Sequence, residues 1–97
     1  MITVTVKYFL GLGEGIGCKE ERVTLLQGAT VGELLEELFE RYGPDFRREV
    51  FDDAAGRVHS YVLILVNGLA LTQLREGLDT ALDTGDVVIL TRPISGG

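Results

Sequence analysis

The sequence predicts an α+β domain in which one main helix packs on one face of a mixed sheet of four to five strands. Three patterns support this prediction: an alternating apolar run at residues 2–8, a helical periodicity at 30–42, and β-rich runs between 61 and 91. With 97 residues the chain has the size of one domain. We therefore expect a single domain over 1–97, of which residues 91–97 form a C-terminal tail.

The first two strands are expected to pair as a hairpin with a long tip. Apolar residues alternate with polar ones from residue 2 to residue 8, which is the period of a strand with one buried face. The glycine-punctuated stretch 11–21 then reads as flexible chain. A second strand follows at 22–26, with Val23 and Leu25 on one face.

The helix has a clear start, one apolar face and a clear end. Thr30, followed by Glu33, forms a capping-box pattern in which each side chain accepts a hydrogen bond from a free backbone N–H. Gly43-Pro44 ends the helix, because proline cannot continue the hydrogen bonding. The apolar residues between these signals recur on one helical face: Val31, Leu34, Leu35, Leu38, Phe39 and Tyr42.

The remaining chain supplies the later strands. Residues 45–60 give a weaker pattern, a short helical turn around 46–51 and then an exposed loop or hairpin. The continuous apolar run 61–66 suits a strand buried on both faces. Asn67-Gly68 predicts a type I′ turn into a short strand at 69–71, and a turn-rich segment then leads to the final strand, 87–91.

Composition and charge narrow the class of protein. The net charge of −6, with no cluster of Lys or Arg, disfavours binding to nucleic acid or to an anionic membrane. The N-terminus alternates apolar with polar residues, unlike a signal peptide. One cysteine, Cys18, cannot form an internal disulfide, which fits a reducing compartment. We expect a cytoplasmic protein.

The order of elements is that of the β-grasp, the fold of ubiquitin: a hairpin, a helix that crosses the sheet, and a later hairpin. Six residues follow the last strand, 92–97, and end in Gly96-Gly97. At a maximal rise near ~3.5 Å per residue, such a tail could extend roughly 20 Å from the sheet.

The motifs resemble those of the MoaD/ThiS sulfur-carrier family, and especially the small subunit of molybdopterin synthase. The resemblance is carried by the strand and turn at 64–68, the turn at 79–86 and the terminal VVILTRPISGG. The opening ITVTVKYF and the helix TVGELLEELFERYG are similar to the first half of that family. Arg92-Pro93 departs from the two prolines that the family usually carries, and Thr91 stands where an apolar or aromatic residue is common.

The resemblance implies a carrier that is not itself an enzyme and binds no cofactor or metal. An E1-like adenylating enzyme would use ATP to convert the Gly97 carboxylate into an acyl-adenylate, and a sulfur donor protein would displace AMP to leave a thiocarboxylate. The large subunit of molybdopterin synthase would then use that sulfur to build the molybdenum cofactor.

The tail and a docking patch are the candidate site. Pro93, Ile94, Ser95, Gly96 and Gly97 would thread a partner's active site, since glycines without Cβ atoms fit a narrow channel. Pro93 stiffens the base of this tail. An apolar docking patch is expected from four residues: Phe9, Leu69, Leu71 and Thr91.

Alternatives stay open. Gly97 could instead be joined to lysines of other proteins, as in a ubiquitin-like modifier; the chain could serve thiamine synthesis; or the glycines could be inert. The stretch GLGEGIG reads as a hairpin tip rather than a phosphate loop. Cys18 could accept sulfur or be regulated by oxidation, but nothing in the neighbouring sequence marks a lowered thiol pKa. His59 has no partner at ligand spacing, and the glutamate face of the helix is either solvated or meets a basic partner.

Overall fold

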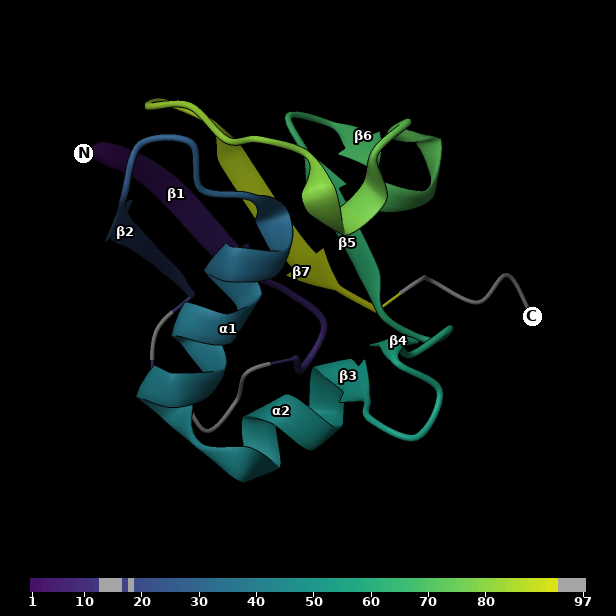
Figure 1. Cartoon of the computed structure of the whole chain (residues 1–97). Helices are drawn as coiled ribbons and strands as arrows, with labels where there is room; N and C mark the ends of the chain where they lie inside the picture. Colours follow the sequence, from purple (N-terminus) through teal and green to yellow (C-terminus); the bar gives the residue numbers. More distant parts are fainter. Residues whose placement is uncertain (13–16, 18, 93–97) are drawn as a thin grey trace.

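A mixed five-stranded sheet lies against one long helix in the computed structural model of the chain, which describes residues 1–12, 17 and 19–92 (Figure 1). The strands are β1 (Ile2–Tyr8), β2 (Glu20–Leu25), β3 (Phe51–Asp52), β4 (Arg57–Val58), β5 (Leu63–Val66), β6 (Leu69–Ala70) and β7 (Val87–Thr91). The helices are α1 (Val31–Tyr42) and α2 (Pro44–Val50), with 3₁₀ turns at Leu71–Gln73 and Gly77–Asp79.

The strand order of the main sheet is β2-β1-β7-β5-β6, and β3 and β4 form a separate two-stranded hairpin. β7 therefore lies at the centre of the main sheet, parallel to β1 and antiparallel to β5. Parallel neighbours need a long crossover, which here runs through α1 and the later strands. This is the β-grasp arrangement, and it confirms the predicted fold class.

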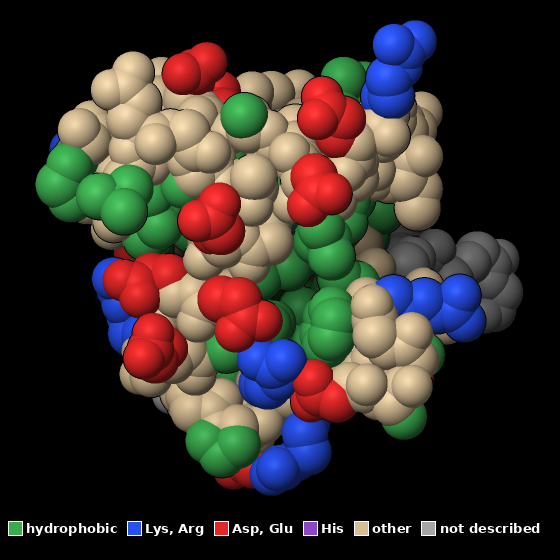
Figure 2. All heavy atoms as spheres, in the orientation of Figure 1, with side chains coloured by type: hydrophobic (Ala, Val, Ile, Leu, Met, Phe, Trp, Pro, Cys, Tyr) green, Lys and Arg blue, Asp and Glu red, His purple; other side chains and the backbone are tan. Residues whose placement is uncertain are grey.

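Both ends of α1 follow the sequence signals. The Glu33 N–H donates to Thr30 Oγ1 at 3.2 Å, and the Thr30 N–H donates to Glu33 Oε1 at 3.2 Å, so the capping box is complete. The helix ends at Tyr42, and Gly43 takes a φ of 95°, which a residue with a side chain rarely adopts. Acidic side chains gather over the outer face of α1 (Figure 2).

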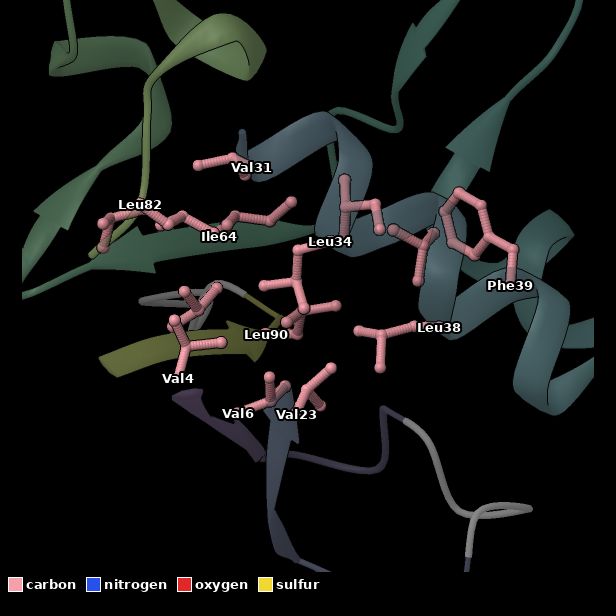
Figure 3. Packing of buried hydrophobic residues seen from close by; sticks show 14 of the residues in the cluster. Val4, Val6, Val23, Val31, Leu34, Leu38, Phe39, Ile64, Leu82 and Leu90 are labelled. Carbon is pink, nitrogen blue, oxygen red and sulfur yellow. The ribbon is translucent and has the colours of Figure 1, made fainter. Parts of the chain in front are cut away.

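The core lies between α1 and one face of the sheet (Figure 3). Leu34 and Leu38 of α1 point towards Val6, Val23 and Leu90 of three different strands. Each of these five side chains has no exposed surface, so removing several methyl groups from any of them would leave a cavity costing about 2–5 kcal/mol.

The run 61–66 is not buried on both faces as expected. Strand β5 begins only at Leu63; Ile64 and Val66 are buried towards α1, whereas Leu63 and Leu65 are partly exposed. β7 alternates in the same way up to Leu90. The reason is that α1 covers one sheet face, so a continuous apolar run does not by itself establish a second covering layer.

The weakly patterned segment 45–60 folds as a helix and a hairpin, as the sequence suggested. Phe46 is buried in α2, and its ring lies 5.9 Å from the centroids of both Phe39 and Tyr42. β3 and β4 then pair through Phe51 and Val58. The aromatic contacts fix α2 against α1, so this segment extends the core at one end of the sheet.

The predicted type I′ turn joins β5 to β6, with φ of 50° at Asn67 and 88° at Gly68. Asn67 also ties the turn to β7, because its Oδ1 accepts a hydrogen bond from the Val87 N–H at 2.9 Å. Within the described ranges, no group of His, Cys, Asp and Glu could hold a metal ion. No helix in that same part of the chain has the length and apolar character needed to cross a membrane.

Candidate functional site

The base of the C-terminal tail is anchored in the middle of the sheet. β7 is paired on both edges up to its end, with Leu90 opposite Tyr8 on one side and Thr91 opposite Leu63 on the other. The Phe9 N–H donates to the Leu90 carbonyl at 3.0 Å and extends this pairing. A strand held on both sides makes a rigid base for whatever follows it.

The predicted tail residues Pro93, Ile94, Ser95, Gly96 and Gly97 lie outside the described residues, as does Cys18. Their roles stay predictions.

An ion pair links the last described residue, Arg92, to α2. Arg92 Nη2 lies 3.7 Å from Glu49 Oε1, and the two side chains are 50% and 28% exposed. Such a half-exposed pair contributes at most about 1 kcal/mol and weakens with salt. It nevertheless ties the residue that follows β7 to α2.

The four residues of the predicted docking patch do not share one surface. Phe9 is 46% exposed beside the end of β7. Leu69 is 51% exposed, but it is paired with Val66 at the far edge of the sheet, three strands from β1. Leu71 is partly buried and packs against the core, and Thr91 is buried. Thr91 therefore has little surface for a partner, because the strand pairing at the base of the tail covers it.

The sheet face opposite α1 offers a surface that the sequence interpretation missed. The strand register places Lys7 beside Ile89, Ile89 beside Leu65, and Leu65 beside Ala70. All four side chains are partly exposed. We call this row of four residues the open face. Its sequence signal was that both sets of alternating side chains in 87–90 are apolar: Val88 and Leu90 in one set, Val87 and Ile89 in the other.

His59 takes a structural position. Its Nε2 lies 2.8 Å from the Arg48 carbonyl oxygen, and its ring stacks on Tyr61 with the centroids 4.7 Å apart. These contacts hold the end of the β3–β4 hairpin against α2. They bring no acid, base or metal ligand to the base of the tail.

The last strand lies at the centre of the sheet, and one helix packs across a face of that sheet. Together these features define a ubiquitin-like β-grasp protein. Residues 6–97 match the model of the ThiS family. The chain belongs to this family of ubiquitin-like sulfur carriers.

The chain is similar along its whole length to several known proteins. It is 34% identical to small archaeal modifier protein 3 of Haloferax volcanii over an alignment of 92 residues. This alignment covers 95% of this chain and 96% of that protein. The solution structure of small archaeal modifier protein 1 from Methanosarcina acetivorans is 31% identical, with a TM-score of 0.80 over 100% of this chain and 98% of that one. A Pyrococcus furiosus protein, provisionally named molybdopterin converting factor subunit 1, is 30% identical, with a TM-score of 0.74 over 97% and 100% of the two chains.

Proposed function

We propose that this chain is a sulfur carrier for molybdenum cofactor biosynthesis, acting through the carboxylate of Gly97. The observation that carries the proposal is the anchored central strand β7, followed by six residues that end in Gly96-Gly97, within the region that matches the sulfur-carrier family. The similarity to the Pyrococcus furiosus protein named for molybdopterin conversion supports the proposal that the sulfur is used in molybdenum cofactor biosynthesis. A cytoplasmic location fits the single cysteine of the chain, Cys18, which cannot form an internal disulfide.

The chemistry divides between the carrier and its partners. A carboxylate oxygen of Gly97 attacks the α-phosphorus of ATP on an E1-like enzyme, and pyrophosphate leaves. A donor protein releases hydrosulfide, whose sulfur attacks the acyl carbon; AMP leaves with the C–O bonding electrons, and the hydrosulfide proton passes to solvent. The thiocarboxylate that remains gives its sulfur to the precursor held by the large subunit of molybdopterin synthase. In this scheme the carrier supplies an acyl group and a surface, and its partners supply the catalytic groups.

The open face supports docking next to this chemistry. Ile89 and Leu65 lie on β7 and β5, the strands whose paired ends hold the base of the tail. An enzyme that covers these two side chains has residues 92–97 within roughly 20 Å of the docked surface. We therefore assign the open face to the adenylating enzyme.

A second candidate function, protein modification, is supported by the relatives named small archaeal modifier proteins. The first step would be the same adenylation of Gly97. A lysine amine of a target protein, instead of sulfur, would then end up bonded to the acyl carbon as an isopeptide.

The test is the intact mass of the protein purified from its native host, together with a search for branched peptides in the same extract. One sulfur in place of one oxygen at Gly97, without branched peptides, supports the carrier. Trypsin cleaves poorly before proline, so Arg92-Pro93 stays joined and a branch would carry residues 76–97. The search must therefore use this long remnant, and branched peptides would support modification.

A variant lacking Gly96-Gly97 is the matched control, because the folded domain that ends with β7 is retained. It should show neither the sulfur nor the branch. If the full chain keeps an unaltered carboxylate after incubation with a cognate activating enzyme, ATP and a sulfur donor, both proposed functions fail.

A further inference from the structure

A groove lies between α1 and the end of β2. These two elements lie on the side of the molecule away from the base of the tail (Figure 1). Its volume is about 360 Å³. Met1, Leu25, Leu26 and Ala29 supply its apolar lining. Met1 and Leu26 are 79% and 73% exposed, so this lining is open to a partner.

The wall of the groove on α1 is acidic. Its charged residues are Glu33, Glu36, Glu37 and Glu40, and none of the residues that line the groove is a lysine or arginine. Figure 2 shows acidic side chains beside hydrophobic ones over the part of the molecule where Figure 1 places α1 and β2. An occupant that carries positive charge therefore complements this wall.

Two of these carboxylates have arginine partners outside the groove. Arg47 Nη1 lies 3.1 Å from Glu36 Oε2, and Arg41 Nη2 lies 3.7 Å from Glu37 Oε1. Glu40 is exposed and has no ion pair among residues 1–12, 17 and 19–92. The groove thus keeps a net negative charge.

Opposite these glutamates, the groove reaches the end of an edge strand, with Thr24 and Leu25 of β2 in its lining. β2 is the first strand in the order of the main sheet and pairs only with β1 there. The Thr5 N–H donates to the Asp86 carbonyl and the Gly85 N–H to the Thr3 carbonyl, so Thr3 and Thr5 direct their backbone groups away from β2.

In an antiparallel pair, every second residue directs its backbone N–H and C=O groups to the neighbouring strand. This alternation determines which backbone groups of β2 have no partner on β1. Arg22 and Thr24 lie opposite Thr5 and Thr3, so their N–H and C=O groups point out of the sheet, towards the edge. Val23 and Leu25 direct theirs to β1. An open edge of this kind is a template for an added strand.

We propose that this groove binds a basic, extended segment of a partner protein, which adds as a strand to the edge of β2. Backbone hydrogen bonds to Arg22 and Thr24 would hold the segment, aliphatic side chains would cover Leu26 and Met1, and flanking lysines or arginines would meet the glutamates of α1. A second copy of this chain fits less well, because its own glutamates would repel those of the first. Since the groove and the base of the tail lie on different sides, a bound segment does not cover the base of the tail.

The test is a titration of the ¹⁵N-labelled full chain with the peptide Arg-Lys-Val-Ile-Val-Lys-Arg, followed by amide chemical shifts and amide exchange. We expect saturable binding below about 1 mM. The amides of Arg22 and Thr24 should shift most and exchange more slowly, while those of Val23 and Leu25 change less. Two control peptides, Glu-Glu-Val-Ile-Val-Glu-Glu and Arg-Lys-Val-Pro-Val-Lys-Arg, should bind at least about tenfold more weakly, since one reverses the charge and the other removes a strand donor.

The matched protein variants separate the groove from net charge. The double substitution Glu37→Lys/Glu40→Lys should weaken binding about tenfold, whereas Glu76→Lys/Asp79→Lys, which changes the net charge equally at two exposed residues outside the groove, should change it less than about twofold. Equal binding of the acidic peptide, shifts that do not alternate along β2, or no binding at about 1 mM would overturn the proposal. Concentration-dependent shifts of the same amides without peptide would show that the occupant is a second copy, and would overturn it as well.

Discussion

Ile89→Glu tests the open face because it places a carboxylate where the adenylating enzyme is proposed to dock. In the free protein Ile89 is partly exposed, so the new carboxylate can reach water. Its cross-strand neighbour Lys7 can also pair with it. We therefore expect the free protein to lose only about 1 kcal/mol of stability, equivalent to roughly 4–8 °C in Tm.

The effect on the complex should be much larger. The complex buries this carboxylate together with Lys7, so the carboxylate is either protonated or held in a desolvated ion pair. Protonating a glutamate of ordinary pKa at pH 7 costs about 3.7 kcal/mol, which sets the largest expected loss in kcat/KM for the adenylation of Gly97 at about 500-fold. Ile89→Ala introduces no charge and removes from the interface only the apolar surface that Ile89 exposes in the free protein. The loss in kcat/KM should therefore be about two- to fivefold.

The assay is ATP–pyrophosphate exchange catalysed by a cognate activating enzyme at varied carrier concentration. Leu74→Ala is the control for lost stability, since Leu74 is a partly buried residue that packs against the core and is not one of the four open-face residues. If Ile89→Glu is folded at the assay temperature and keeps kcat/KM within about threefold of the unaltered chain, the enzyme does not bury Ile89 and our assignment of the open face is wrong.

Three further predictions concern stability and the base of the tail. Thr30→Ala breaks the capping box and should cost about 1 kcal/mol in the free energy of unfolding, measured by thermal or urea denaturation; an unchanged Tm would contradict a role for the cap. Arg92→Ala should raise the KM for adenylation by no more than about fivefold without changing kcat, and the effect should vanish in high salt, because the Glu49 pair is half exposed. Hydrogen bonds from Arg47 lower the pKa of Asp53, so this pair stabilises the fold above the ordinary carboxyl pKa of 3.8 and loses that effect as the pH falls below it. The stability difference between Asp53→Asn and the unaltered chain should therefore shrink on acidification, and a difference that persists at pH 2 would contradict the linkage.

Features set by local sequence were predictable. The start of α1 depends on Thr30 and Glu33 alone, and its end depends on Gly43. The turn after β5 depends on two residues that accept positive φ. In each case the residues that decide the structure are neighbours along the chain, so a short window contains the whole physical cause.

Features that depend on contacts between distant parts of the chain could not be predicted from the sequence. Whether one or both faces of β5 are covered depends on how many layers the chain supplies, which the run 61–66 does not encode. The same holds for Arg47, whose guanidinium lies 5.1 Å from the ring centroid of Phe39 and 5.5 Å from that of Phe51. These residues come from three elements, and only their packing brings the charge onto the rings.

The docking patch failed as a single surface for a related reason. Phe9 and Leu69 were grouped because both are apolar residues expected outside the core, but exposure alone does not place two residues together. The register separates them by three strands, and Leu69 lies opposite Val66, whose side chain points towards α1. Cross-strand neighbours, rather than exposed residues in general, define a surface on a sheet.

The placement of β7 explains how one small domain can serve more than one partner. Because the last strand is central, the tail begins between two paired neighbours, and the outer strand β2 keeps a free edge on the opposite side. A protein held in the groove beside β2 therefore need not compete with an enzyme docked on Ile89. If Glu37→Lys/Glu40→Lys weakens peptide binding about tenfold yet leaves adenylation unchanged, while Ile89→Glu impairs adenylation and leaves peptide binding unchanged, the two surfaces are independent. Loss of both activities in either variant would instead mean that one partner spans both.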